Sequence, residues 1–115
     1  MRILGCGGRD FDRYVYVYDT LDSLQEQYGP FTHMIVGGAA GADYWCESWA
    51  WMCKIPFTRF EADWKRHGRK AGPLRNQRML DEGKPDIVVA FPGGRGTADM
   101  IRRAKSENIR LIEAY

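Results

Sequence analysis

Three glycine-rich segments contain the residues best suited to chemistry. Each has paired glycines beside charged or hydroxyl side chains: "GCGGRD" at 5–10, "VGGAAGAD" at 36–43 and "FPGGRGT" at 91–97. Glycines let backbone N–H groups approach an anionic oxygen with no Cβ in the way, and a helix that follows adds unpaired N–H donors. Such segments are typical of phosphate-binding loops, although a tight turn alone also favours glycine.

The elements that position these segments alternate between short apolar runs and helix-like stretches. We expect strands at 2–6, 33–37, 55–60, 86–91 and 110–114, helices at 12–28, 41–53, 73–83 and 97–107, and mainly loop at 61–72. This order predicts a three-layer α/β fold of Rossmann-like type with a mainly parallel five-stranded sheet. The carboxyl ends of parallel strands share one edge, so the three segments should converge on one crevice.

Convergence favours a phosphate-bearing ligand over three unrelated tight turns. The expected ligand-binding residues are Gly7, Gly8, Arg9, Asp10, Gly37, Gly38, Gly41, Asp43, Arg75, Asn76, Gly93, Gly94, Arg95, Gly96 and Thr97. Arginine suits bidentate phosphate contacts, and Thr97 either caps its helix or offers its hydroxyl to a phosphate. The spacing matches neither G-x-G-x-x-G nor a P-loop, which disfavours a standard NAD dehydrogenase or a P-loop NTPase.

The composition is that of an ordinary soluble globular chain. Its 115 residues suffice for one compact domain, 1–115, and the net charge of +2 creates no field that would require a nucleic-acid partner. No apolar run reaches the roughly 20 residues of a membrane span, and the N-terminal apolar run is too short for a signal peptide. We therefore expect a cytoplasmic protein with no membrane partner.

Metal binding is not expected. Cys6, Cys46 and Cys53 form no C-x-x-C pair, and His33 and His67 lie far apart in the chain. The cysteines are expected to be reduced, buried thiols.

Four motifs carry a family resemblance: "GGRDF" at 7–11, "GGAAGAD" at 37–43, "ADWKRHGRKAGPLRNQRML" at 62–80 and "FPGGRGTADM" at 91–100. In this order they resemble the DUF2493 family, also called YspA- or cpYpsA-related, of the SLOG superfamily. That superfamily includes the Lonely Guy phosphoribohydrolases and the DprA/Smf DNA-processing proteins. The resemblance implies a SLOG-type Rossmann-like domain over 2–114 and a nucleotide or nucleotide-sugar ligand.

One position departs from the Lonely Guy pattern P-G-G-x-G-T-x-x-E. Residues 92–97 match it, but Met100 stands where that family has its catalytic Glu. A thioether cannot act as an acid or base, nor stabilise an oxocarbenium-like transition state. Glycosidic hydrolysis would need Asp10, Asp43 or Asp99 as a substitute. Asp10 and Asp43 equally suit a ribose hydroxyl or a helix cap.

The segment between Arg59 and Arg78 is strongly basic. Its cations at 65, 66, 69 and 70 are better explained as a solvated surface than as a site. Trp64 either stacks on a base or anchors the core, and the lone loop residue His67 is expected to be exposed.

The helix at 41–53 carries more aromatics than one buried face can take. Trp45, Cys46, Trp49 and Cys53 fit one face, whereas Tyr44 and Trp51 project elsewhere. Exposed aromatic surface predicts a partner interface, here a homo-oligomer formed through this helix.

Three functions fit these features. The first is a module that binds a nucleotide or ADP-ribose-like ligand as a sensor, carrier or sequestering protein. The second is a Lonely Guy-like hydrolase of nucleotide N-glycosidic bonds. The third is binding of single-stranded DNA, as in DprA/Smf proteins. The basic segment beside Trp64 supports this third function.

Overall fold

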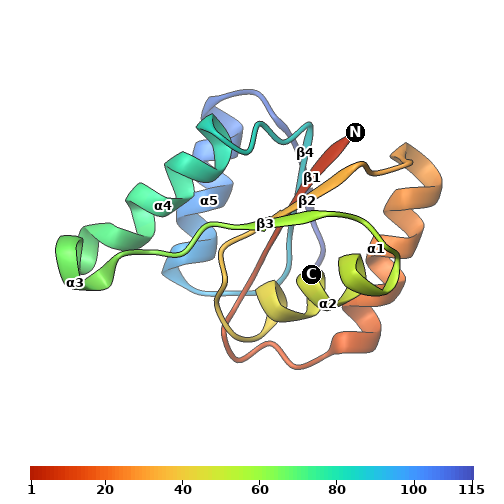
Figure 1. The fold of residues 1–115 in the computed structure, drawn as a ribbon, viewed down its shortest axis with the longest axis horizontal. Coiled ribbons are helices and arrows are strands. Elements are labelled where there is room, and N and C mark those ends of the chain that lie inside the picture. Colours follow the sequence, from red (N-terminus) through yellow and green to blue (C-terminus); the bar gives the residue numbers. More distant parts are fainter.

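The computed structural model describes residues 1–115 as alternating strands and helices (Figure 1). The elements are β1 (Arg2–Cys6), α1 (Tyr14–Tyr28), β2 (His33–Val36), α2 (Ala42–Met52), β3 (Phe57–Arg59), α3 (Trp64–His67), the short 3-10 helix η1 (Gly68–Lys70), α4 (Ala71–Asp81), β4 (Ile87–Ala90), α5 (Arg95–Ser106) and β5 (Arg110–Glu113). Helices α1 and α2 lie on one side of the sheet, and α4 and α5 lie on the other.

The five strands form one parallel sheet in the order β3-β2-β1-β4-β5. In its register, Ile3 of β1 pairs with Met34 of β2 and with Ile87 of β4. The predicted three-layer Rossmann-like fold is therefore confirmed. The strand order reverses beside β1, so the turns that follow β1 and β4 flank the point where open α/β sheets bind ligands.

Two apolar cores cover the two faces of the sheet. Ile3 belongs to the core under α1 and α2, and the next residue, Leu4, belongs to the core under α4 and α5. This alternation follows from the period of two in a strand. Because both faces are covered, β1, β2 and β4 are nearly continuous apolar runs, which made them recognisable in the sequence.

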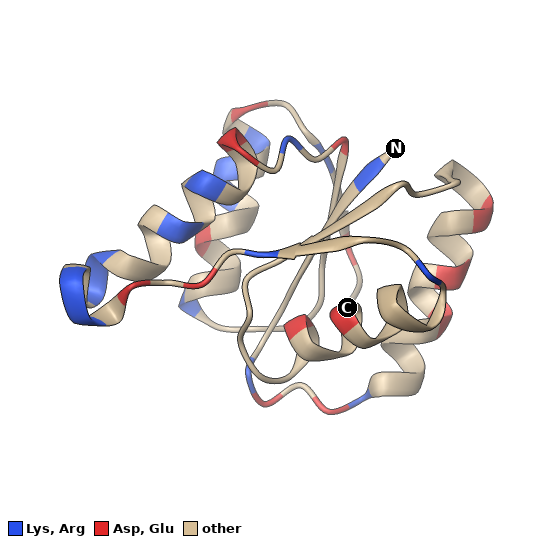
Figure 2. Ribbon diagram, viewed as in Figure 1, with Lys and Arg blue, Asp and Glu red and all other residues tan.

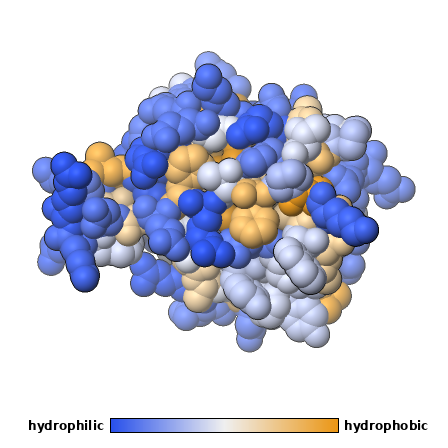
Figure 3. Space-filling model, viewed as in Figure 1, coloured by the Kyte–Doolittle hydropathy of each residue, from blue (hydrophilic) through white to orange (hydrophobic).

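The expectation of mainly loop at 61–72 is wrong. This segment forms α3, η1 and the start of α4. Asp63 is the N-cap of helix α3, and its carboxylate accepts a hydrogen bond from the Arg66 amide at 3.2 Å. The segment projects from the body, and mainly hydrophilic side chains cover it (Figures 1 and 3). A helix with no buried residue has no apolar periodicity by which to recognise it.

Helix α2 divides its side chains between core and solvent. Trp49 is buried, whereas Tyr44 and Trp51 are 55% and 74% exposed, as predicted. Cys53 was expected on the buried face but is exposed, because it follows the last turn of the helix, whereas Cys6 and Cys46 are buried. The homo-oligomer inferred from the exposed aromatics stays a prediction. None of the helices combines the length and apolar character needed to cross a membrane.

Candidate functional site

A cleft of about 1360 Å³ lies along the carboxyl edge of the sheet. It is lined by all three glycine-rich turns. Every expected ligand-binding residue except Gly41 contributes to its wall: Gly7, Gly8, Arg9, Asp10, Gly37, Gly38, Asp43, Arg75, Asn76, Gly93, Gly94, Arg95, Gly96 and Thr97. The predicted convergence of the three segments is thus present in the structure.

Gly8 joins the three turns through its backbone. Its amide donates to the Pro92 carbonyl at 2.9 Å, and its own carbonyl accepts from the Ala42 amide at 3.1 Å. Gly41 supports this junction from behind, since it has a φ of +73° and a Cβ there would collide with the Gly8 carbonyl. Gly41 is therefore a packing residue in this structure and does not line the cleft.

The glycines of the turn after β4 differ in what surrounds them. A Cβ on Gly93 would collide with Thr97 and would lie 2.7 Å from the Gly8 amide nitrogen, so packing alone explains that glycine. A Cβ on Gly94 or Gly96 would meet nothing within 4 Å, and neither residue has a φ in the left-handed region. The protein's own packing therefore gives no reason for glycine at these two positions.

Helix α5 begins at the cleft, and no side chain caps its N-terminus. Its N-cap residue is Gly94, and its first turn holds no acidic residue. The first backbone hydrogen bond of the helix runs from the Ala98 amide to the Gly94 carbonyl at 3.0 Å, so the amides of residues 95–97 precede it. These donors and the positive end of the helix dipole suit an anion. Thr97 is buried and makes no cap hydrogen bond.

Arg75 reaches from α4 to the turn after β2. Its Nη1 donates to the Gly37 carbonyl at 2.6 Å, and its Nε donates to the Asn76 side-chain oxygen at 3.1 Å. Burial lowers the pKa of Arg75, although the nearby Asp43 carboxylate acts in the opposite direction. The guanidinium is thus fixed in place at the wall of the cleft.

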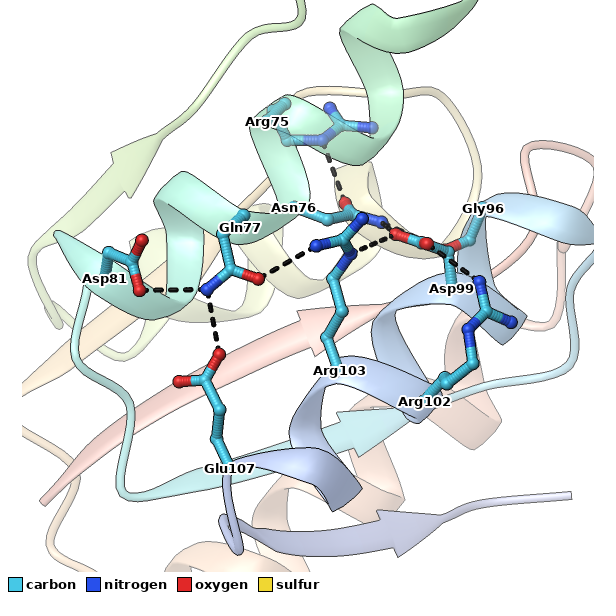
Figure 4. Close-up of polar contacts among 9 residues, drawn as sticks. All are labelled: Arg75, Asn76, Gln77, Asp81, Gly96, Asp99, Arg102, Arg103 and Glu107. Atoms are coloured by element: carbon cyan, nitrogen blue, oxygen red, sulfur yellow. Dashed lines mark hydrogen bonds and ion pairs between the residues drawn. The ribbon is translucent and has the colours of Figure 1, made fainter.

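A polar network connects α4 to α5 below the cleft (Figure 4). The Asn76 side-chain nitrogen donates to the Gly96 carbonyl at 3.2 Å and to an Asp99 oxygen at 2.9 Å. Asp99 also accepts from Arg102 at 2.9 Å and from Arg103 at 2.8 Å. Asn76 and Asp99 line the cleft, but their hydrogen bonds are made with other residues of α4 and α5.

The three candidate aspartates have different surroundings. Asp10 is exposed. Burial raises the pKa of Asp99, but hydrogen bonds from Arg103 and Asn76 more than offset this and hold it below the ordinary value. Asp43 is 6% exposed, and burial raises its pKa to about 6 despite a 3.1 Å hydrogen bond from the Ala39 amide and the nearby Arg75. Of the two buried carboxyls, only Asp43 can exchange a proton near neutral pH.

Charge is distributed unevenly between the two faces of the sheet (Figure 2). Helices α1 and α2 contain no Lys or Arg, whereas the segment from α3 to α4 and helix α5 are rich in both. The small net charge conceals this asymmetry. The cationic side supplies Arg69, Arg75 and Arg95 to the cleft wall, and the turn after β1 supplies Arg9.

Sequence reasoning missed or left open several cleft residues. Arg69 was assigned to a solvated surface, yet it lines the cleft, whereas Lys65, Arg66, Lys70 and His67 are exposed outside it. The reading of Trp64 as a core anchor is wrong, since its ring is half-exposed and faces the cleft. Phe11, Glu61, Gly72 and Pro73 also line the wall. The positions of Trp64, Arg69 and Gly72 depend on the helical form of 61–72, which composition did not reveal, whereas Phe11 belongs to the turn after β1.

Two comparisons with known proteins agree with the family resemblance. The sequence model of the YspA, cpYpsA-related SLOG family matches residues 1–67, which include the first two glycine turns. Gene 61 protein of Mycobacterium phage D29 is 38% identical over 120 residues, covering 96% of this chain and 94% of the phage protein. No solved structure matches significantly. The chain therefore belongs to the YspA, cpYpsA-related SLOG family.

Proposed function

We propose that residues 1–115 act as a single SLOG-type domain that binds a nucleotide or nucleotide-derived, ADP-ribose-like ligand. The phosphate lies against the turn Gly94–Thr97 at the start of α5. The observation that carries this proposal is the open space beside Gly94 and Gly96, where an added Cβ would meet nothing within 4 Å. Glycine at such positions is explained if a ligand occupies the space.

The electrostatics of the cleft support an anionic ligand. The uncapped start of α5 supplies amide donors, and Arg9 and Arg95 line the same wall. Membership of the SLOG family points to a nucleotide-related function. A sensor, carrier or sequestering role follows from binding without turnover.

Calorimetric titration with AMP, ADP and ADP-ribose tests the proposal. Arg95→Ala and Gly94→Val should each weaken binding at least about 10-fold, which corresponds to roughly 1.4 kcal/mol. Arg66→Ala is the matched control, because Arg66 is exposed and does not line the cleft. Thermal melts confirm that each variant folds. Unchanged affinity in both cleft variants would show that the phosphate site is elsewhere.

The surroundings of Asp43 favour one second candidate, hydrolysis of a nucleotide N-glycosidic bond. Its raised pKa suits a general acid or base at neutral pH, and it lies in the cleft. Met100, at the Glu position of the Lonely Guy pattern, is buried and has no acid–base chemistry. This candidate requires release of free base from a nucleoside monophosphate, abolished in Asp43→Asn while ligand binding persists.

A further inference from the structure

Trp64 is half-exposed, although the large apolar ring of a tryptophan stabilises a fold when it is buried. It is 50% exposed and lines the cleft at the start of α3. Aromatic rings of this size normally contribute to a core or to an interface. The sheet already has two complete cores without it. The position of the ring therefore calls for an explanation other than folding.

The fold holds this ring in place from two directions. Asp63 caps α3 immediately before Trp64 and fixes the start of the helix. On the α4 side, a Cβ on Gly72 would lie 3.3 Å from Cη2 of the ring, so the absence of a side chain there lets the indole pack closely on α4. Gly72 is buried in the first turn of α4, and this contact gives a packing reason for glycine there.

Arg9 connects the ring to the first glycine turn. Its guanidinium carbon lies 5.8 Å from the centroid of the Trp64 ring, within the range of a cation–π contact. Both residues line the cleft, but they come from elements far apart in the chain. The ring thus belongs to the same cavity as the glycine turns, and a cationic group that suits phosphate lies next to it.

We propose that Trp64 is the platform on which the ligand's aromatic base stacks, an inference that rests on the proposed function. The ligand class is then a nucleoside phosphate that retains its base, in preference to a sugar phosphate or a polyphosphate. Every base has a π-face, so the platform recognises the presence of a base more than its identity. Stacking on an aromatic side chain strengthens binding by about 5- to 150-fold, as judged by alanine substitution.

Calorimetry with two probes separates the base from the phosphate. AMP carries both, and ribose 5-phosphate carries the phosphate alone. Trp64→Ala should weaken AMP binding at least about 5-fold and leave ribose 5-phosphate unchanged, whereas Trp64→Phe should retain most of the AMP affinity. Gly72→Ala, which displaces the ring by a few tenths of an ångström without removing it, should give an intermediate loss for AMP alone.

Fluorescence gives an independent measurement. AMP should quench tryptophan emission in the wild-type protein, and Trp64→Phe should remove most of the quenching while the affinity persists. If AMP binds but Trp64→Ala leaves its affinity unchanged, or weakens both probes equally, the stacking proposal is overturned while the phosphate site stands. If neither probe binds the wild-type protein, the proposed function fails and the base platform fails with it.

Discussion

The Asn76 side-chain nitrogen lies 2.9 Å from a carboxylate oxygen of Asp99 and joins α4 to α5 beneath the cleft. The same nitrogen donates to the Gly96 carbonyl, in the first turn of α5. The start of α5 is therefore fixed relative to α4 before any ligand arrives. Preorganised donors lose little freedom on binding, which favours affinity for an anion.

Asp99→Asn should destabilise the fold by about 1–3 kcal/mol. The change removes the buried negative charge with which Arg102 and Arg103 form ion pairs. Urea unfolding followed by circular dichroism measures this change. Arg102→Ala is the control, since that side chain is 71% exposed and its loss should cost less than about 1 kcal/mol. Equal effects of the two changes would contradict a buried structural role for Asp99.

Asp43→Asn should stabilise the protein at neutral pH. Since burial raises the folded pKa of Asp43 to about 6, above the ordinary value of 3.8, the folded state binds more protons than the unfolded state between these values. The contribution of Asp43 to the free energy of unfolding is therefore fully present below about pH 4, and it is lost as the pH rises through about 6. The variant should therefore gain up to about 3 kcal/mol above pH 7 and little at pH 4.

Chemical denaturation of wild type and Asp43→Asn across pH 4 to 8 measures this effect. The side-chain oxygen of Asn still accepts the hydrogen bond that Asp43 takes from the Ala39 amide, and the change removes the charge at nearly constant volume. A stability difference that does not vary with pH would show that Asp43 titrates normally in the folded protein.

The fold and most cleft residues could be predicted because they depend on local patterns. Strand β4 is an apolar run, and the glycine turns follow strands whose ends must meet at one edge. The role of Asn76 could not be predicted, since its partners Gly96 and Asp99 lie 20 and 23 residues away. Trp64 was placed only when α3 proved to be helical, and no apolar periodicity indicated that helix.

Gly41→Ala should be far more damaging than Gly68→Ala. Both glycines combine a positive φ, +73° and +56°, with a ψ of −129° and −131°, a conformation that alanine rarely adopts, so both variants bear a backbone cost of about 1–3 kcal/mol. Only at Gly41 would the new Cβ also collide with backbone atoms of Gly8 and Arg9, whereas at Gly68 it would meet nothing within 4 Å. The difference between their melting temperatures measures the crowding at the junction of the turns, and similar values would contradict it.

Thiol labelling should distinguish Cys53 from the other two cysteines. Cys53 is exposed, whereas Cys6 and Cys46 are buried, and burial raises the pKa of both buried thiols. Because the thiolate is the reacting form, native protein should react with Ellman's reagent at about one thiol per chain, and denatured protein at three. Partial burial also raises the pKa of Cys53, so its rate should increase with pH beyond 8.5. Cys53→Ser should remove the native reaction, and fast labelling that persists in this variant would show that a buried thiol becomes accessible through local opening.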